Sequence, residues 1–318
     1  MSGGPGAGTG VGPSAVVPAQ YEALRRGAGV VDLGRDALAV HGPDALDYLQ
    51  GQLSQDLTPL GVGASTWSLL LSPQGKLDAL VRVTRADVER VVIDVDGGFG
   101  EATRQRLERF RLRVKATVEP LAWRCLAVRG PHAASLVVPV DGAAATAGAP
   151  VLALPFDWNG VVGVDLLGPA PAAPAGAVAC DRAAWEAVRV EAGIPVMGAE
   201  LDERTIAAEA GLVERTVSFT KGCFTGQELV ARLDARGNRV ARHLRGLVGE
   251  EGADPGAFVP GAGLSQEDKA VGAVTSVAWS PGLGRVVALA YLHRSVAPPA
   301  AVTVGGRARA EVRDLPLL

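Results

Sequence analysis

The stretch with the clearest chemical content is Lys-Gly-Cys-Phe-Thr-Gly-Gln-Glu, residues 221–228. It holds one of the three cysteines of the chain, Cys223, which lies two residues from Lys221 and just before a helix-favouring segment that starts at Gln227. A cationic neighbour and a helix N-terminus both favour thiolate over thiol, which predicts a reactive thiol at a ligand-accessible turn. The alternative is a small buried hydrophobe, because free cysteines are usually buried and inert. The residues alone leave both interpretations open.

Glycines and arginines add to this stretch. Gly222 and Gly226 predict a positive φ or the close approach of another group to the backbone. Glu228 precedes Arg232 by four residues, the order that favours an ion pair on a helix. A basic run follows, made of Arg232, Arg236, Arg239, Arg242 and Arg245. It is either a solvated face with local pairs or an anion patch for a polyglutamate tail, a phosphate or RNA. The break at Gly237-Asn238 favours the first.

Other chemical motifs are weaker. Asp78 is a carboxylate in an otherwise apolar strand, so it lies either on the solvent face of an edge strand or inside a pocket. Gly75-Lys76 lacks the glycine and the hydroxyl residue of a phosphate-binding P-loop, and the glycine-rich residues 6–12 have no flanking strand and helix. The histidines show no metal-ligand spacing, so no metal site is predicted; they are His41, His132, His243 and His293.

Length and composition indicate the class of protein and the number of subdomains. The chain has 318 residues, which exceeds the usual single core and predicts two or three packed subdomains. A hydrophobic share of 48% with 20% charged residues suits a globular protein, and the net charge of −3 gives no global sign of a nucleic-acid or membrane partner. Three dispersed cysteines without a CxxC pair fit a reducing cytosol, so we expect a cytoplasmic protein. Residues 1–20 read as a disordered Gly/Pro tail without signal-peptide features.

Periodicity and turn residues predict an α+β body followed by an all-β domain. The predicted helices are residues 21–26, a segment opened by Gly42-Pro43-Asp44 with Leu46, Leu49 and Leu53 on one face, residues 98–110 and residues 181–193. The predicted strands are two that flank the Gly34 turn, a hairpin of residues 66–71 and 77–84, and residues 88–95, 111–120, 122–128 and 161–167. Residues 139–150 and 168–177 are predicted loops, and the Val-rich runs after Gly246 predict a small antiparallel barrel or sandwich.

The 221–228 stretch, followed by Val-Ala-Arg, resembles the K-G-C-[YF]-x-G-Q-E signature of the YgfZ folate-binding family. These proteins are relatives of the T-protein of the glycine cleavage system, an aminomethyltransferase. The resemblance extends upstream through WEAVRVEAGIPVMGAEL and AAEAGLVERTVSFTKGC, and to the opening VVDLGRDALAVHGPDALDYLQGQLSQDL. It therefore covers the chain from about Tyr21 to the predicted barrel.

This resemblance implies an α+β fold, a tripartite ring of two ferredoxin-like α+β subdomains and a C-terminal antiparallel β-barrel. The expected boundaries are a tail at 1–20, a folate-binding subdomain at 21–120, a second subdomain with the signature at 121–245, and a barrel at 246–318, the two subdomains being open to interleaving. It also implies tetrahydrofolate, or a one-carbon derivative, in a central channel. The implied ligand-binding residues are Glu209, Lys221, Gly222, Phe224, Gln227, Glu228 and Arg232.

The same resemblance implies two functions. The first is a folate-binding accessory protein for iron–sulfur cluster assembly or repair, with Cys223 as its functional thiol and iron–sulfur clients or assembly proteins as partners. Iron–sulfur enzymes of tRNA modification are one route through which it would act. The second is an aminomethyl or one-carbon transferase, or a demethylase, that uses Asp78. The T-protein carries paired carboxylates where this chain has Asp78 followed by Ala79, and this departure favours the first function. Phe224 replaces the commoner tyrosine, and Ala207-Ala208 stands where the family often has proline. A scaffold that binds RNA or protein through the arginine run is the third hypothesis.

Overall fold

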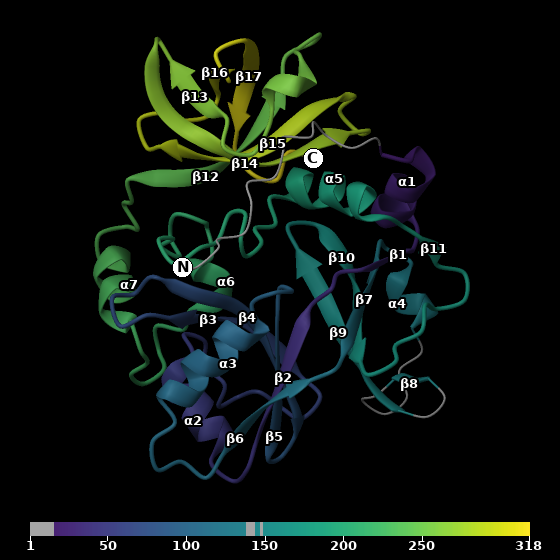
Figure 1. Ribbon diagram of the computed structural model, residues 1–318, viewed down its shortest axis with the longest axis vertical. Helices are drawn as coiled ribbons and strands as arrows, with labels where there is room; N and C mark the ends of the chain where they lie inside the picture. Colours follow the sequence, from purple (N-terminus) through teal and green to yellow (C-terminus); the bar gives the residue numbers. More distant parts are fainter. Residues whose placement is uncertain (1–15, 138–143, 147–148) are drawn as a thin grey trace, which may run out of the picture.

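The computed structural model describes residues 16–137, 144–146 and 149–318. The fold consists of two sheets and a barrel, and residues of all three pack in one hydrophobic core (Figure 1). The six-stranded sheet has the order β11 (Val178–Ala179), β1 (Gly29–Asp32), β7 (Arg124–Arg129), β10 (Val161–Gly168), β9 (Ala149–Trp158), β8 (Ala144–Thr146). The five-stranded sheet has the order β3 (Ser65–Leu71), β4 (Leu77–Asp87), β5 (Arg90–Val95), β2 (Asp36–His41), β6 (Thr117–Leu121).

The C-terminal strands close into the predicted antiparallel barrel. Its order is β12 (Arg242–Gly249), β15 (Arg285–His293), β14 (Lys269–Ser280), β13 (Gly263–Gln266), β16 (Ala300–Val304), β17 (Ala308–Arg313). A closed barrel leaves no edge strand, so these short Val-rich strands pair on both sides. The first barrel strand begins at Arg242, four residues before the predicted boundary, because residues 242–245 already pair with β15.

The helices cover the sheets and join them to the barrel. They are α1 (Pro18–Arg26), α2 (Ala45–Gln52), α3 (Gly100–Arg109), α4 (Ala133–Leu136), α5 (Arg182–Ala192), α6 (Val213–Thr216) and α7 (Gln227–Asp234), with a short 3-10 turn at Pro255–Ala257. The Asp181 side chain caps α5 by accepting a hydrogen bond from the Ala184 N–H at 2.8 Å, and Gly193 ends it in the left-handed conformation. In Figure 1, α5 lies between the barrel and the six-stranded sheet.

The two α+β units exchange segments. β1 belongs to the six-stranded sheet, where it pairs with β7, whereas the next strand, β2, pairs with β5 and β6 in the other sheet. The chain also returns to the five-stranded sheet after α5. There the Leu77 N–H donates to the Thr205 carbonyl at 3.0 Å, and the Ser218 N–H donates to the Ser54 carbonyl at 3.0 Å. Residues far apart in sequence thus meet beside the five-stranded sheet.

Several predicted bounds differ from the observed ones. The strand predicted for 111–120 is confined to Thr117–Leu121, and Val88 lies in the turn before β5. The loop predicted for 139–150 contains β8 and the start of β9, because pairing with neighbouring strands overrides its low-complexity composition. The rest of that loop prediction (139–143 and 147–148) lies outside the described residues, as does most of the predicted tail. α1 begins three residues before the predicted helix, at Pro18. Among the described residues, no helix is long and apolar enough to cross a membrane.

Candidate functional site

A cavity of about 660 Å³ opens between the two sheets and α5. Its walls carry aromatic side chains: Trp67 from β3, Phe156 and Trp158 from β9, and Trp185 from α5. Phe156 and Trp158 meet the Trp67 ring edge-on, with centroids 6.5 and 5.2 Å away. The chain has five tryptophans, and three of them line this one cavity. We call it the aromatic cavity.

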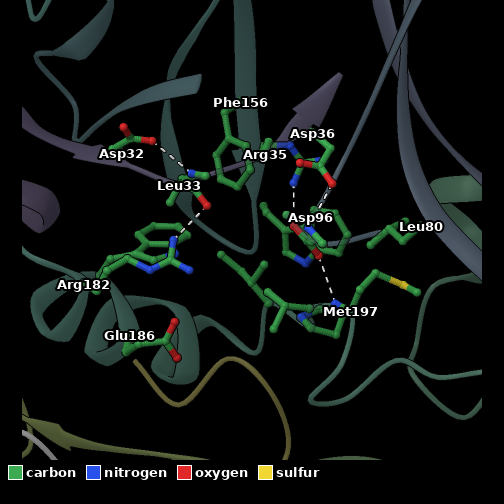
Figure 2. A pocket seen from close by; sticks show the side chains of 18 of the residues that line it. Asp32, Leu33, Arg35, Asp36, Leu80, Asp96, Phe156, Arg182, Glu186 and Met197 are labelled. Carbon is green, nitrogen blue, oxygen red and sulfur yellow. Dashed lines mark hydrogen bonds and ion pairs between the residues drawn. The ribbon is translucent and has the colours of Figure 1, made fainter. Parts of the chain in front are cut away.

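Charged groups stand at two sides of the aromatic cavity (Figure 2). On one side, Asp96 accepts hydrogen bonds from Arg35 Nη1 at 2.7 Å and from the Met197 N–H at 2.9 Å. On the other side lie Arg182 and Glu186 of α5. Arg182 Nη1 donates to the Leu33 carbonyl at 2.9 Å, which leaves its other N–H groups for a ligand.

Glu186 has a free oxygen. Both hydrogen bonds that it receives come from Arg189, at 2.9 and 2.6 Å, and both go to Oε2. Within the described residues, Oε1 accepts none. The Glu186 carboxylate therefore stays anchored and still offers an acceptor at the wall of the aromatic cavity.

A close contact between two loops fixes Arg35 and Asp96. Gly34, between β1 and β2, has a φ of 61°, and a Cβ on Gly97 would lie 1.9 Å from the Gly34 carbonyl oxygen. Only glycine allows this approach of two backbones. The sequence signal at Gly34 was a turn, and the structure shows that the turn carries the chain from one sheet to the other.

A buried charge network supports the floor of the cavity. Arg35 pairs with Asp94, and Arg82 binds the same Asp94 through both Nε and Nη2, at 2.9 and 3.1 Å. Arg82 also pairs with Asp165 of the opposite sheet, which pairs with Arg129 at 2.7 Å. Although burial acts to raise the pKa of Asp165, Arg129 and Arg82 hold it below its usual range. The guanidinium groups of Arg35 and Arg82 each lie 5.5 Å from the Trp67 ring centroid.

The signature stretch, residues 221–228, lies outside the aromatic cavity. Cys223 is exposed, which selects the accessible thiol over the buried hydrophobe, and it is not among the residues that line the aromatic cavity. Lys221 Nζ donates to the carbonyls of Gln50, Leu53 and Gln55, at 2.6, 2.7 and 3.0 Å. Burial lowers the Lys221 pKa to about 8, although Asp56 opposes this. Lys221 thus fastens the signature loop to the end of α2.

Phe224, Gln227 and Gly226 of the signature contact other parts of the protein. The Phe224 N–H donates to Gln227 Oε1 at 3.1 Å, and the Phe224 ring packs on the core. Gly226 has a φ of 81°, and its Cβ would lie 2.5 Å from the Ser72 carbonyl oxygen, so this glycine meets the prediction of close approach. Gly222 does not, since nothing lies within 4 Å of a Cβ built there.

Ligand binding by the signature residues stays a prediction, since these residues lie outside the aromatic cavity. Its lining residues include none of Lys221, Gly222, Phe224, Gln227 and Glu228. The physical reason is that this stretch and α7 pack against the β3–β4 hairpin (Figure 1).

Asp78 is also outside the aromatic cavity. Leu77 pairs with Leu71 and Ala79 with Leu70, so Asp78 is the extra residue of a β-bulge. Strict alternation would place Asp78 on the face of Leu80, which lines the cavity. The bulge turns the side chain instead to Arg106, at 2.9 Å. Burial raises the Asp78 pKa, although Arg106 opposes this.

Glu209 and the arginine run have other partners. Glu209 Oε2 accepts from Arg242 at 3.1 Å and lines a second cavity, not the aromatic one. Arg232 is exposed on α7, and among the ion pairs of the described residues there is none with Glu228. Arg245 lies 3.6 Å from Asp314. Local pairing therefore accounts for Arg242 of the run, whereas the Arg245 pair is long and exposed to water. No group of three or more His, Cys, Asp and Glu side chains in the described part of the chain could hold a metal ion.

Sequence reasoning missed the residues that form the aromatic cavity. They come from the β1–β2 turn, β3, β9 and α5, and no single window of the chain contains them. The available signal lay in the composition. Aromatic residues make up only 4% of the chain, yet Trp67 lies in the predicted strand 66–71 and Trp158 lies just before the predicted strand 161–167. Because tryptophan has a large aromatic side chain, its presence in a protein with few aromatic residues indicates a place where a ring is bound or packed.

Comparisons with known proteins agree with this architecture. A family model described as the GCVT N-terminal domain matches residues 13–156, and one described as the glycine cleavage T-protein C-terminal barrel domain matches residues 242–318. An aminomethyltransferase of Cutibacterium acnes is 31% identical over 88% of this chain and 83% of the relative. An aminomethyltransferase of Streptomyces avermitilis is 30% identical over 90% and 84%.

A solved structure shows the same fold. The glycine cleavage system aminomethyltransferase T from Bartonella henselae superposes with a TM-score of 0.79 at 22% identity, covering 94% of this chain and 89% of that one. Together, the two α+β units and the closed barrel define a T-protein-like protein. The chain belongs to the GCVT family of aminomethyltransferase relatives.

Proposed function

We propose that this protein binds a tetrahydrofolate-type ligand in the aromatic cavity and serves as an accessory protein for iron–sulfur cluster assembly or repair. The observation that carries the proposal is the cavity itself, about 660 Å³ with tryptophans on three of its walls. Ligand pockets of this kind are mostly apolar, with a few placed polar groups, and measure roughly 300–1,000 Å³. A pterin ring with an aminobenzoyl arm matches that size and character.

The polar groups of the cavity suit the two ends of such a ligand. The amino-pyrimidine edge of a pterin carries N–H donors, and Glu186 Oε1 is an acceptor free of protein hydrogen bonds in the described structure. Arg182 offers N–H donors to a carbonyl or carboxylate beside the same helix. Trp67 and Trp185 line the cavity with apolar ring surface.

The accessory role is supported by the position of the thiol. Cys223 is exposed to solvent and separate from the residues that line the aromatic cavity. A thiol in that place can meet a partner protein, and it cannot hold an iron–sulfur cluster alone because clusters take about four ligands. The signature resemblance to folate-binding proteins of the YgfZ family points to iron–sulfur clients as those partners.

The test is a calorimetric titration with tetrahydrofolate under anaerobic, reducing conditions. We expect micromolar or tighter binding, weakened by about tenfold or more in Trp67→Ala, because loss of a stacked ring costs about 1.5 kcal/mol. Trp67→Phe keeps a ring and should retain most of the affinity. Trp279→Ala, on a barrel strand and 37% exposed, is the matched control. No binding by the wild type, or equal loss in the control, contradicts the proposal.

The second candidate is a folate-dependent aminomethyl or one-carbon transferase that uses Asp78. The names of the relatives from Cutibacterium acnes and Streptomyces avermitilis favour it. The geometry favours the accessory protein, because the bulge turns Asp78 to Arg106. Asp78→Asn should leave tetrahydrofolate affinity unchanged. Amine-dependent turnover that disappears in Asp78→Asn would establish the transferase instead.

A further inference from the structure

A second cavity, of about 410 Å³, lies where α6, the end of α5 and the first barrel strand meet. Trp158 and Pro195 line both this cavity and the aromatic one, so the two share a wall. The proposed function makes no use of it. We call it the basic cavity, after Arg215 and Arg245, which line it together with His243.

Arg215 has no acidic partner in the described structure. Its Nη1 donates to the Asp157 carbonyl at 2.8 Å, and its guanidinium lies 4.5 Å from the Trp158 ring centroid. The Asp157 carbonyl and the Trp158 ring hold the guanidinium in place, but neither carries a negative charge that would neutralise it. One N–H direction is used, and four remain for a ligand.

Arg245 is only partly compensated. Its Nε is buried and has no hydrogen-bond acceptor among the described residues. The nearest carboxylate, on Asp314, is 3.6 Å away and its side chain is 73% exposed. An ion pair that is this long and this exposed to water adds little stabilisation and neutralises the Arg245 charge only in part.

The other carboxylate in the basic cavity is already neutralised. Glu209 Oε2 accepts a hydrogen bond from Arg242 Nε at 3.1 Å and forms an ion pair with Arg242 Nη2, also at 3.1 Å. Burial and the neighbouring Arg245 lower the His243 pKa, although Glu209 opposes this. The positive charges of Arg215 and Arg245 thus exceed the buried negative charge available to them.

We infer that the basic cavity binds an oxyanion, a carboxylate or phosphate, between Arg215 and Arg245. Guanidinium groups present planar N–H pairs that match the oxygens of both anions. Two sources supply this chemistry. One is a free small anion. The other is the glutamyl tail of a ligand whose rings occupy the adjoining aromatic cavity, and this source rests on the proposed function.

The first experiment titrates the full chain with inorganic phosphate, and separately with L-glutamate, at low salt. We expect one site, with affinity reduced about tenfold or more in both Arg215→Gln and Arg245→Gln, since each loses a charged hydrogen-bond donor. Asp314→Asn should strengthen binding, because it removes the competing carboxylate without touching the cavity floor. Arg309→Gln is the matched control, since Arg309 is 67% exposed and 3.4 Å from Glu250.

A second arm distinguishes the sources. It compares tetrahydrofolate carrying one glutamate with the form carrying three. If the longer tail binds more tightly, and Arg245→Gln erases that difference, the anion is the tail. If both forms bind alike while phosphate binds through the arginines, the anion is free.

Two outcomes overturn the inference. In the first, Arg215→Gln and Arg245→Gln leave the affinity for phosphate, for glutamate and for the longer tail unchanged. In the second, Arg309→Gln weakens binding equally, which would indicate general surface charge. Failure of the proposed function has a different signature. In that case tetrahydrofolate does not bind while phosphate still does.

Discussion

At the level of single residues, Cys223 combines exposure with a firmly held surrounding loop. Lys221 ties the loop to three carbonyls at the end of α2, and Gln227 accepts from the Phe224 N–H. The thiol is therefore presented at a fixed place on the surface. Because it does not line the aromatic cavity, ligand binding and thiol chemistry should respond to different substitutions.

Cys223→Ser tests this separation. We expect the variant to bind tetrahydrofolate with wild-type affinity and to unfold at the same temperature, because an exposed sulfur contributes little to packing. The activity of iron–sulfur enzymes in cells that depend on this protein should fall several-fold or more. Cys180→Ser, at the other cysteine with some solvent access, should leave that activity intact. Normal iron–sulfur activity in Cys223→Ser would remove the thiol from the mechanism.

At the level of elements, α7 and the signature loop pack against the β3–β4 hairpin. A Cβ on Gly75 of the hairpin turn would lie 2.5 Å from Leu229 Cβ of α7, and one on Gly226 would meet Ser72 just as closely. The hairpin turn and the helix therefore fit only with glycine on each side. This close contact fixes the signature loop relative to the five-stranded sheet.

Lys221→Met should weaken this junction. The variant keeps the length and apolar stem of the side chain but leaves the carbonyls of Gln50, Leu53 and Gln55 without their donor. We expect a loss of about 1–3 kcal/mol in the free energy of unfolding, measured by urea denaturation, and faster amide hydrogen exchange in residues 218–226. Lys269→Met, at an exposed barrel position, is the control. Wild-type stability in Lys221→Met would show that solvent replaces the ammonium without cost.

The sequence predicts those elements whose signals are local. The α5 helix has its cap at Asp181 and its stop at Gly193, and the hairpin has its Ser-Pro-Gln-Gly turn, so both follow from nearby residues. The aromatic cavity has no such signal, because it depends on β1 and β2 entering different sheets. The bulge that turns Asp78 away is a one-residue register shift, which periodicity alone cannot reveal.

At the level of the whole molecule, buried charges join the parts. Arg82 of the five-stranded sheet pairs with Asp165 of the other sheet. Glu200 joins the segment after α5 to the barrel, since it accepts hydrogen bonds from Thr275 and Ser276. Such groups are costly to bury and become more so when one partner is removed. They therefore favour a single placement of the two sheets and the barrel relative to one another.

Glu191 is the junction at which α1, α5 and the barrel meet. It is fully buried, and it accepts hydrogen bonds from Tyr21 Oη at 2.9 Å and from Ser280 Oγ at 2.5 Å. Its nearest cation, Arg25, is 4.0 Å away. Burial raises the Glu191 pKa, although the two hydroxyl donors and Arg25 oppose this. The folded state consequently holds a proton at Glu191 over a pH range in which the unfolded state has released it.

This difference predicts a pH-dependent stability with a defined sign. The contribution of Glu191 is complete below the ordinary glutamate pKa of about 4.3, and it is lost as the pH rises through the higher folded pKa. Glu191→Gln keeps a neutral side chain of the same shape at every pH. Its free energy of unfolding in urea should therefore decline less than that of the wild type from about pH 4.5 upward, and should at least equal it at neutral pH. Glu203→Gln, at an exposed site, should follow the wild type. If Glu191→Gln and the wild type have the same pH profile, Glu191 is ionised in the folded protein and its hydroxyl donors, not a proton, hold the three parts together.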